Sequence, residues 1–254
     1  MEVKPYLRSI SIAKPEDAKG YPFTIPAIAN LESIEFHRDV TFLIGENGSG
    51  KSTLLEALAL VMGFGAQGGT RNVLIDDDGG SSGLDSYIKV KRSFEKPKDG
   101  YFLRAESFYN VATFMDQLPE FLGSYGGKSL HQQSHGESFM AALVHKFRGR
   151  GLYILDEPEA ALSPSRQLAA LVRINDLVKQ QSQFIIATHS PIIMAYPNAT
   201  IYLLDESGIK KTTFEETEHF RVTRDFLNSY PKRLKQLFST TPLLDLLVDD
   251  DEAP

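Results

Sequence analysis

Hydrophobic and polar positions alternate along the chain in two patterns. Short apolar runs such as Val40–Ile44, Leu152–Leu155 and Phe184–Ala187 are typical of strands that a sheet buries on both faces. Longer segments between them, such as Pro164–Lys179, carry apolar residues at helical spacing. Short strands alternating with helices favour an α/β fold around a mostly parallel sheet.

The same patterns, with the turn residues, predict the remaining elements. Strands are expected at Val3–Ile12, Phe23–Ile28, Leu31–Phe36, Val40–Ile44, Tyr87–Val90, Tyr101–Arg104, Leu152–Leu155, Phe184–Ala187 and Ile201–Leu204. Helices are expected at Lys51–Met62, Ser107–Leu118, Glu137–Phe147, Pro164–Lys179, Thr217–Asn228 and Pro231–Phe238. The glycine-rich segment Gly63–Gly83 is expected to be a mobile surface loop. We expect one domain over residues 1–247 and an acidic, flexible tail over 248–254.

Composition excludes several classes of protein. The 254 residues include 27 Lys and Arg against 33 Asp and Glu, so a net charge of −6 argues against a basic nucleic-acid coat. The absence of cysteine excludes disulfides, thiolate metal sites and a cysteine nucleophile. The N-terminus lacks the apolar core of a secretory signal, and no uncharged apolar stretch approaches 18 residues. We therefore expect a cytoplasmic protein without direct membrane insertion.

One segment carries the spacing of a phosphate-binding loop. An apolar strand runs into Gly45-x-x-x-x-Gly50-Lys51-Ser52, and an amphipathic helix follows. The glycines let successive backbone N–H groups face one anion, and the helix N-terminus adds its positive dipole. Lys51 is expected on the β- and γ-phosphates and Ser52 on Mg²⁺. The predicted ATP site comprises Gly45, Glu46, Asn47, Gly48, Ser49, Gly50, Lys51, Ser52 and Thr53.

Two further strands end in polar residues where an α/β sheet binds its ligands. Asp156 and Glu157 follow the run Leu152–Leu155, and His189 follows Phe184–Ala187. With the phosphate loop, Asp156 is predicted to hold Mg²⁺ opposite Ser52, and Glu157 to orient the attacking water. His189 is predicted to donate a hydrogen bond to the γ-phosphate and report which nucleotide is bound. A structural role for a single histidine at a strand end is the alternative.

A fourth segment completes a resemblance. Gln133-Ser134-His135-Gly136-Glu137 is similar to the LSGGQ signature, although His135 replaces the first glycine. In this order of motifs, the chain resembles the ABC-type ATPases, specifically the small bacterial ones labelled AAA-family or predicted ATPases. The resemblance implies a P-loop NTPase head with an antiparallel β subdomain and a small helical subdomain at about 105–148. It also implies a homodimer on ATP binding, in which Ser134, His135, Gly136 and Glu137 cap the partner's γ-phosphate.

The match also departs from the transporter pattern. Ser163 stands where transporter ATPases usually carry an aspartate, which resembles the genome-maintenance branch more closely. Glu106 is a candidate for the glutamine that couples transporter ATPases to membrane domains. We expect a hydrolysing ATPase whose cycle drives a partner or a nucleic-acid transaction. Two alternatives remain: the nucleotide-binding subunit of a membrane transporter, or an ATP-switched module with little turnover. Ser134 and Glu137 also fit a simple helix cap.

Several residues and clusters have two possible roles. Tyr21 and Phe23 are candidates for adenine stacking or for core packing, and Arg8 for a phosphate contact or a solvent-facing position. Basic clusters at Lys89–Lys98, Lys146–Arg150 and Lys232–Lys235 are either solvated faces or, if they share one face, a track for nucleic acid.

Overall fold

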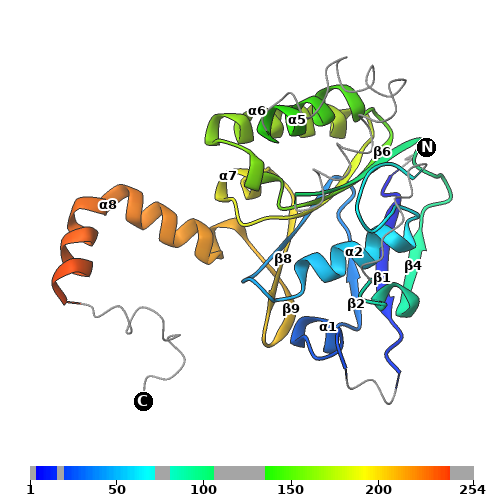
Figure 1. Ribbon diagram of the computed structural model, residues 1–254, viewed down its shortest axis with the longest axis horizontal. Coiled ribbons are helices and arrows are strands. Elements are labelled where there is room, and N and C mark those ends of the chain that lie inside the picture. Colours follow the sequence, from blue (N-terminus) through cyan, green and yellow to red (C-terminus); the bar gives the residue numbers. More distant parts are fainter. Residues whose placement is uncertain (1–3, 16–19, 72–80, 106–134, 241–254) are drawn as a thin grey trace. The chain divides into compact units, whose positions relative to one another are not determined.

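The computed structural model describes residues 4–15, 20–71, 81–105 and 135–240 (Figure 1). They belong to two compact units, Met1–Thr213 and Phe214–Pro254. The predicted helix Ser107–Leu118 and the acidic tail lie outside the described residues, and the prediction of one domain over 1–247 stays a prediction.

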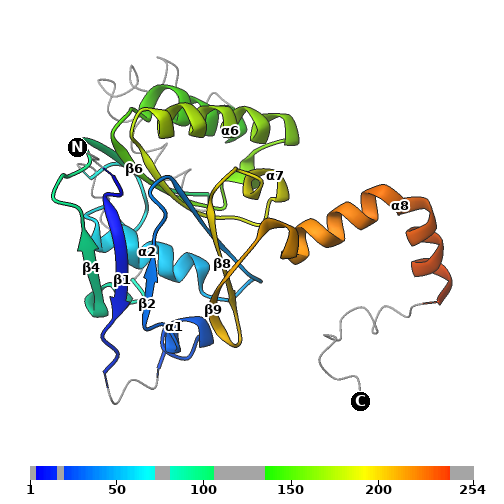
Figure 2. The same ribbon diagram turned by 180° about the vertical axis from the view of Figure 1, so that it is seen from behind.

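A six-stranded sheet forms the centre of the first unit (Figure 2). Its strand order is β5-β6-β7-β3-β8-β9, and only the last pair is antiparallel. All residues of β3, β6 and β7 are buried, as expected of continuous apolar strands covered on both faces. The strands are β3 Val40–Ile44, β5 Asp99–Arg104, β6 Gly151–Asp156, β7 Gln183–Ala187, β8 Thr200–Asp205 and β9 Gly208–Thr212.

Helices lie on both sides of this sheet (Figure 1). On one side, α2 (Lys51–Val61) packs against β6 and β7, burying Leu54, Leu55 and Leu58. On the other lie α5 (His135–Ala141) and α6 (Pro164–Lys179). A π-helical turn, Ala142–Lys146, continues α5. Short helices complete this unit: α1 Pro26–Ala29, η1 Leu84–Tyr87, η5 Pro158–Ala161 and α7 Pro191–Met194. The predicted α/β class is thus confirmed.

A smaller antiparallel sheet has the order β2-β1-β4, with bounds Ser33–Glu35, Leu7–Ile12 and Ile88–Arg92. Ile10 pairs with both Ile34 and Val90, and this face joins the core. On the opposite face Ser9 pairs with Lys91 and Ser11 with Lys89. Because successive residues of a strand point to opposite faces, the lysines of β4 share the outer face with these serines.

The second unit contains a short helical turn, η6 (Phe214–Glu216), and α8 (Glu218–Thr240). The backbone of α8 leaves helical geometry at Ser229, two residues before Pro231. Proline cannot donate the i→i−4 hydrogen bond, so the helix kinks there. The helices predicted at Thr217–Asn228 and Pro231–Phe238 correspond to the two helical segments on either side of this kink. None of the described helices is long and apolar enough to span a bilayer.

Two sequence predictions need correction, and one strand was not predicted. The strand predicted at Phe23–Ile28 is wrong, because turns lead into α1, which has Pro26 in its first turn. The segment Gly63–Gly83 is not a mobile surface loop throughout, because Phe64 is buried and Gly69 pairs with Phe102 of β5. Strand β9, with its exposed lysines, was not predicted.

Candidate nucleotide site

The phosphate loop joins β3 to α2 through glycines in left-handed conformations. Gly45 has a φ of +148°, and a Cβ atom there would lie 2.2 Å from the carbonyl oxygen of Leu204, which no side chain tolerates. Gly50, at φ +97°, is the N-cap of α2 and has no side chain to cap the helix. The first N–H groups of α2 therefore lack a side-chain acceptor at the N-cap and can meet an anion.

Lys51 lies inside this loop with only 4% of its surface exposed. Its Nζ donates to the carbonyl oxygens of Gly45 and Glu46, at 2.7 and 2.8 Å. Burial lowers the pKa of Lys51, and the nearby carboxylates of Glu157 and Asp156 oppose that shift. The loop thus holds the ammonium in place before any phosphate is added.

Two oxygen-bearing side chains, one from the start of α2 and one from the end of β6, meet here. Ser52 Oγ donates to Asp156 Oδ1 at 3.1 Å, and Asp156 is buried at the end of β6. Hydroxyl and carboxylate oxygens are ligands that Mg²⁺ accepts together with water and phosphate, so the pair fits this ion. Among the described residues no cluster of three or more histidines and acids forms a protein-only metal cage. Such a pair suits a metal that shares its shell with a nucleotide.

The phosphate loop also holds a hydroxyl that no hydrogen bond satisfies. Within the described chain, Ser49 Oγ is buried and finds no partner. A buried hydroxyl usually has one, so this atom fits a loop built to surround a further polar group.

Arg104 stands behind Asp156 as an unpredicted neighbour. It ends β5 opposite Asp156, with Nε 3.8 Å from Asp156 Oδ2. Its Nη1 bonds Glu56 Oε2 at 2.8 Å, and Glu56 lies one helical turn beyond Ser52. A cation between two carboxylates offsets their mutual repulsion. The i, i+4 spacing of Ser52 and Glu56 predicts that these two side chains lie on the same face of α2. The pairing of Glu56 with Arg104 depends on the order of strands in the sheet, which the spacing does not show.

The structure brings the polar ends of β6 and β7 together. His189 Nε2 lies 3.5 Å from Glu157 Oε1. Glu157 has a left-handed backbone, φ +50°, and its N–H donates to the carbonyl of Ala187. Glu159, which the sequence did not single out, accepts a hydrogen bond from the backbone N–H of His189 at 2.5 Å.

A cavity of about 520 Å³ opens over the phosphate loop. Tyr21, Ile25 and Glu157 are among the residues that line it, and the Tyr21 hydroxyl lies 3.2 Å from Thr53 Oγ1. Phe23 is buried instead and packs edge-on against Tyr87, with ring centroids 5.2 Å apart. The remaining lining residues are Asn47, Gly48, Gly50, Lys51, Ser52 and Thr53.

The predicted signature is described only in part. Ser134 lies outside the described residues, as does Glu106, and His135 begins α5. A Cβ on Gly136 would meet the carbonyl of Ala161 at 2.5 Å, so the glycine allows close packing there. Glu137 pairs with Arg166 of α6 at 3.4 Å. Neither Gly136 nor Glu137 lines the chain's own cavity.

Arg8 is exposed on β1 and does not line the cavity either. Its alternative interpretation as a solvent-facing strand residue therefore agrees with the structure better than a phosphate contact within the same chain.

A family model of the AAA domain matches residues 23–185, which span well over half of the chain. The chain belongs to this AAA domain family. Within it, the chain is an ABC-type ATPase domain, in agreement with the resemblance drawn from its motifs.

Two curated proteins are similar to the chain at low identity or over a short segment. The ribose import ATP-binding protein RbsA of Bacillus cereus is 26% identical over 245 residues, which cover 84% of this chain and 48% of that protein. An uncharacterised ABC transporter ATP-binding protein of Haemophilus influenzae is 35% identical over 77 residues, which cover 30% of this chain and 29% of the relative. The chain thus spans about half, or less, of the curated relatives it matches.

A solved structure supports the fold. The chain is similar to cbiO1 from Clostridium perfringens, part of the ABC transporter complex cbiONQ, with a TM-score of 0.50 at 18% identity. The match covers 92% of this chain and 99% of that one. At this identity the similarity concerns the fold alone.

Proposed function

We propose that this ABC-type domain binds and hydrolyses ATP with Mg²⁺, and that two copies close head to tail around the nucleotide. The observation that carries the proposal is that Lys51, Ser52 and Glu157 line one cavity at the carboxyl edge of the sheet, where Ser52 also bonds to Asp156. Open α/β sheets bind their ligands at this edge.

Each group has a role that its position supports. The phosphate loop and Lys51 would bind the β- and γ-phosphates, and Ser52 and Asp156 would hold Mg²⁺, which neutralises charge on phosphate oxygens. Glu157 would orient and polarise a water whose oxygen bonds to the γ-phosphorus while the bond to the β-phosphate oxygen breaks. His189, beside Glu157, would donate to the γ-phosphate.

The second copy would supply what the chain's own cavity lacks. Gly136 and Glu137 belong to the predicted signature but do not line the cavity of their own chain. A helix N-terminus favours an anion, so the start of α5 suits a phosphate held by a partner. This arrangement would make ATP itself part of the dimer interface.

Two other functions are alternatives to a hydrolysing ATPase. The similarity to transporter ATP-binding proteins favours a transporter subunit, against which Ser163 departs from the transporter pattern. A switch with little turnover would keep the binding residues without needing the Glu157–His189 pair, whose 3.5 Å contact favours hydrolysis.

One variant tests the proposal directly. Glu157→Gln should bind ATP but release phosphate about 10²- to 10⁴-fold more slowly, since it loses the group that polarises the water. With ATP and Mg²⁺ it should accumulate as a dimer, measured by light scattering after gel filtration. Glu206→Gln, which removes an exposed carboxylate from the β8–β9 turn, is the matched control and should behave as wild type. Unchanged phosphate release in Glu157→Gln would overturn the role of Glu157.

A further inference from the structure

Two of the three basic clusters in the sequence meet at one edge of the first unit. The backbone N–H of Lys98 donates to the carbonyl of Arg150 at 2.9 Å, and the Arg150 guanidinium pairs with Glu95 at 3.3 Å. We call the segments Lys89–Asp99 and Arg148–Arg150 together the basic edge. Its basic residues, all exposed, are Lys89, Lys91, Arg92, Lys96, Lys98, Arg148 and Arg150.

Charge is unevenly distributed as a result. The basic edge carries those seven cations against two acids, Glu95 and Asp99, so its net charge is 7 − 2 = +5 in a chain of net charge −6. One of the acids is already paired with Arg150, and the other accepts from the Tyr153 hydroxyl at 2.7 Å. The edge thus keeps a concentrated positive field in an otherwise acidic chain, which favours a polyanionic ligand.

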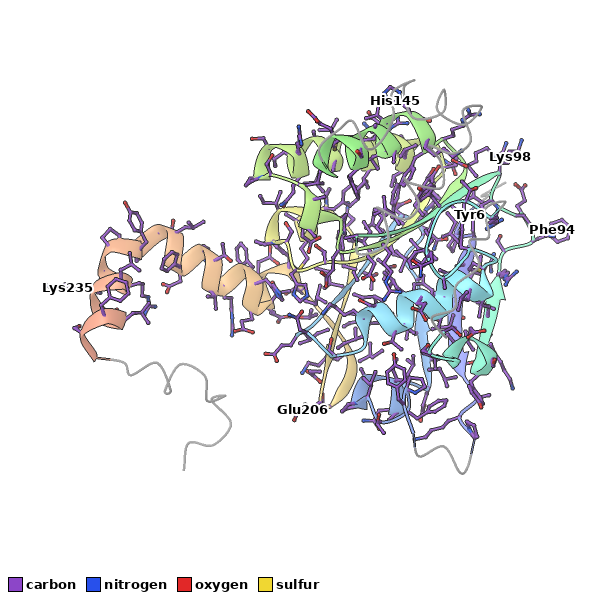
Figure 3. The ribbon with its side chains drawn as sticks, in the orientation of Figure 1. Tyr6, Phe94, Lys98, His145, Glu206 and Lys235 are labelled. Atoms are coloured by element: carbon purple, nitrogen blue, oxygen red, sulfur yellow. The ribbon has the colours of Figure 1, made fainter. Side chains whose placement is uncertain are left out.

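A phenylalanine stands in the middle of this charge. Phe94 is 101% exposed, whereas Phe42, Phe64 and Phe102 are buried. Its loop is tied on both sides, because Ser93 N–H donates to the carbonyl of Tyr6 at 3.0 Å and Lys98 N–H donates to Arg150. Figure 3 shows Phe94 projecting away from the body of the unit, with Lys98 on the same side. An anchored loop therefore presents a bare aromatic ring among cations.

Hydroxyl groups extend the surface along the small sheet. Ser9 and Ser11 share the outer face of β1 and β4 with Lys91 and Lys89, their register partners. Serine hydroxyls and lysines are the side chains that contact phosphate and sugar in nucleic-acid complexes. Positive charge along a surface combined with an exposed aromatic ring is the arrangement that binds unpaired, stackable bases.

We propose that the basic edge binds single-stranded nucleic acid, with its phosphates on the lysines and arginines and a base stacked on Phe94. Lysines on an edge strand also discourage strand pairing, which explains Lys89 and Lys91 but not the cations in the two loops. A membrane surface fits less well, because Phe94 is the single large exposed apolar side chain that this described surface offers, and membrane binding scales with buried apolar area.

The surface lies apart from the ATP site. β5 and β6 begin at the basic edge and end at Arg104 and Asp156, which places the two about 17 Å apart along the strands at roughly 3.3 Å per residue. The inference extends the proposed function by naming a ligand for it, but the surface does not need the nucleotide to form. A failure to bind nucleic acid would therefore leave the ATPase proposal intact. A failure to hydrolyse ATP would likewise leave the binding proposal intact.

Fluorescence anisotropy of the full chain with a labelled oligothymidylate of about 20 nucleotides, without ATP, tests the charge. We expect Lys96→Glu with Lys98→Glu to weaken binding at least tenfold and to lower the salt slope by about 1.4, since each contact contributes about 0.7 on single strands. The matched control, Lys210→Glu with Lys211→Glu, makes the same charge change on β9 and should weaken binding far less. Equal losses would overturn the assignment to the basic edge.

Phe94 separates stacking from charge. Phe94→Ala should weaken single-strand binding about 5- to 150-fold, the range for one stacked base, while Phe94→Tyr should retain it. Since the ring is fully exposed, neither change disturbs the core. Affinity unaffected by Phe94→Ala, tighter binding of a duplex of the same length, or binding to phosphatidylserine vesicles but not to the oligonucleotide would each overturn the proposal.

Discussion

Glu159 holds the backbone of His189 next to Glu157. Oε1 of Glu159 accepts the His189 N–H at 2.5 Å, and the imidazole Nε2 then lies 3.5 Å from the Glu157 carboxylate. Glu159 itself does not line the cavity. We therefore infer that Glu159 is a positioning residue, which would act on the proposed hydrolysis through the place it gives His189.

Removing this carboxylate should slow the reaction without weakening substrate binding. We expect Glu159→Ala to lower kcat about 10- to 100-fold with little change in KM, because a small misplacement of a reacting group costs rates of this size. Glu159→Gln keeps an oxygen acceptor for the N–H and should retain most of the activity. Steady-state phosphate release measures both constants. A rise in KM in Glu159→Ala with kcat unchanged would contradict the positioning role.

Lys51 should determine ATP affinity. Lys51→Ala removes a charge-assisted contact to phosphate, so the Kd for ATP should rise about 10- to 100-fold in isothermal titration calorimetry. Lys14→Ala, an exposed lysine after β1, is the control for the lost charge. Affinity retained in Lys51→Ala would rule out the phosphate-loop assignment.

The same lysine predicts a pH dependence. Burial lowers the pKa of Lys51, so the ammonium loses its proton at a lower pH than an exposed lysine does. Since phosphate binding favours the charged form, ATP affinity should fall as the pH rises toward the ordinary lysine value of about 10.4. Lys51→Arg, which stays protonated, should lack this alkaline loss. Titrations at several alkaline pH values distinguish the two proteins.

Tyr21 should contribute to nucleoside binding. Its ring lines the cavity with 63% of the residue exposed, and its hydroxyl lies 3.2 Å from Thr53 Oγ1. If adenine stacks on the ring, Tyr21→Ala should raise the KM for ATP about 5-fold or more, while Tyr21→Phe should change it little. Phe23→Ala, by contrast, should lower the melting temperature, because Phe23 packs in the core. An unchanged KM in Tyr21→Ala would exclude the stacking role.

Local patterns explain which parts of the fold could be predicted. Val40–Ile44 and Pro164–Lys179 have the predicted bounds, since a buried parallel strand and an amphipathic helix each leave an apolar pattern. Strand β9 leaves none, because Lys210 and Lys211 are exposed at the sheet edge. The short helix at Pro26–Ala29 was missed because Phe23–Ile28 is as apolar as a strand.

The site divides in the same way. The phosphate loop is a continuous segment, so spacing alone places Gly45, Gly50 and Lys51 correctly relative to one another. Arg104 and Glu56 meet only because β5 lies next to β6 and α2 packs against β6, an arrangement that no single segment of sequence encodes. Contacts made by sheet order, rather than by spacing along the chain, are what the sequence left unpredicted.

The two carbonyl oxygens that accept from Lys51 affect the expected rate of ATP association. A long, unrestrained lysine would have to give up its rotational freedom at the moment of association, whereas here Gly45 and Glu46 have already restricted it. An arriving triphosphate needs only to exchange one set of acceptors for another around a stationary ammonium. Association should accordingly be governed by diffusion and charge rather than by a slow rearrangement of the loop.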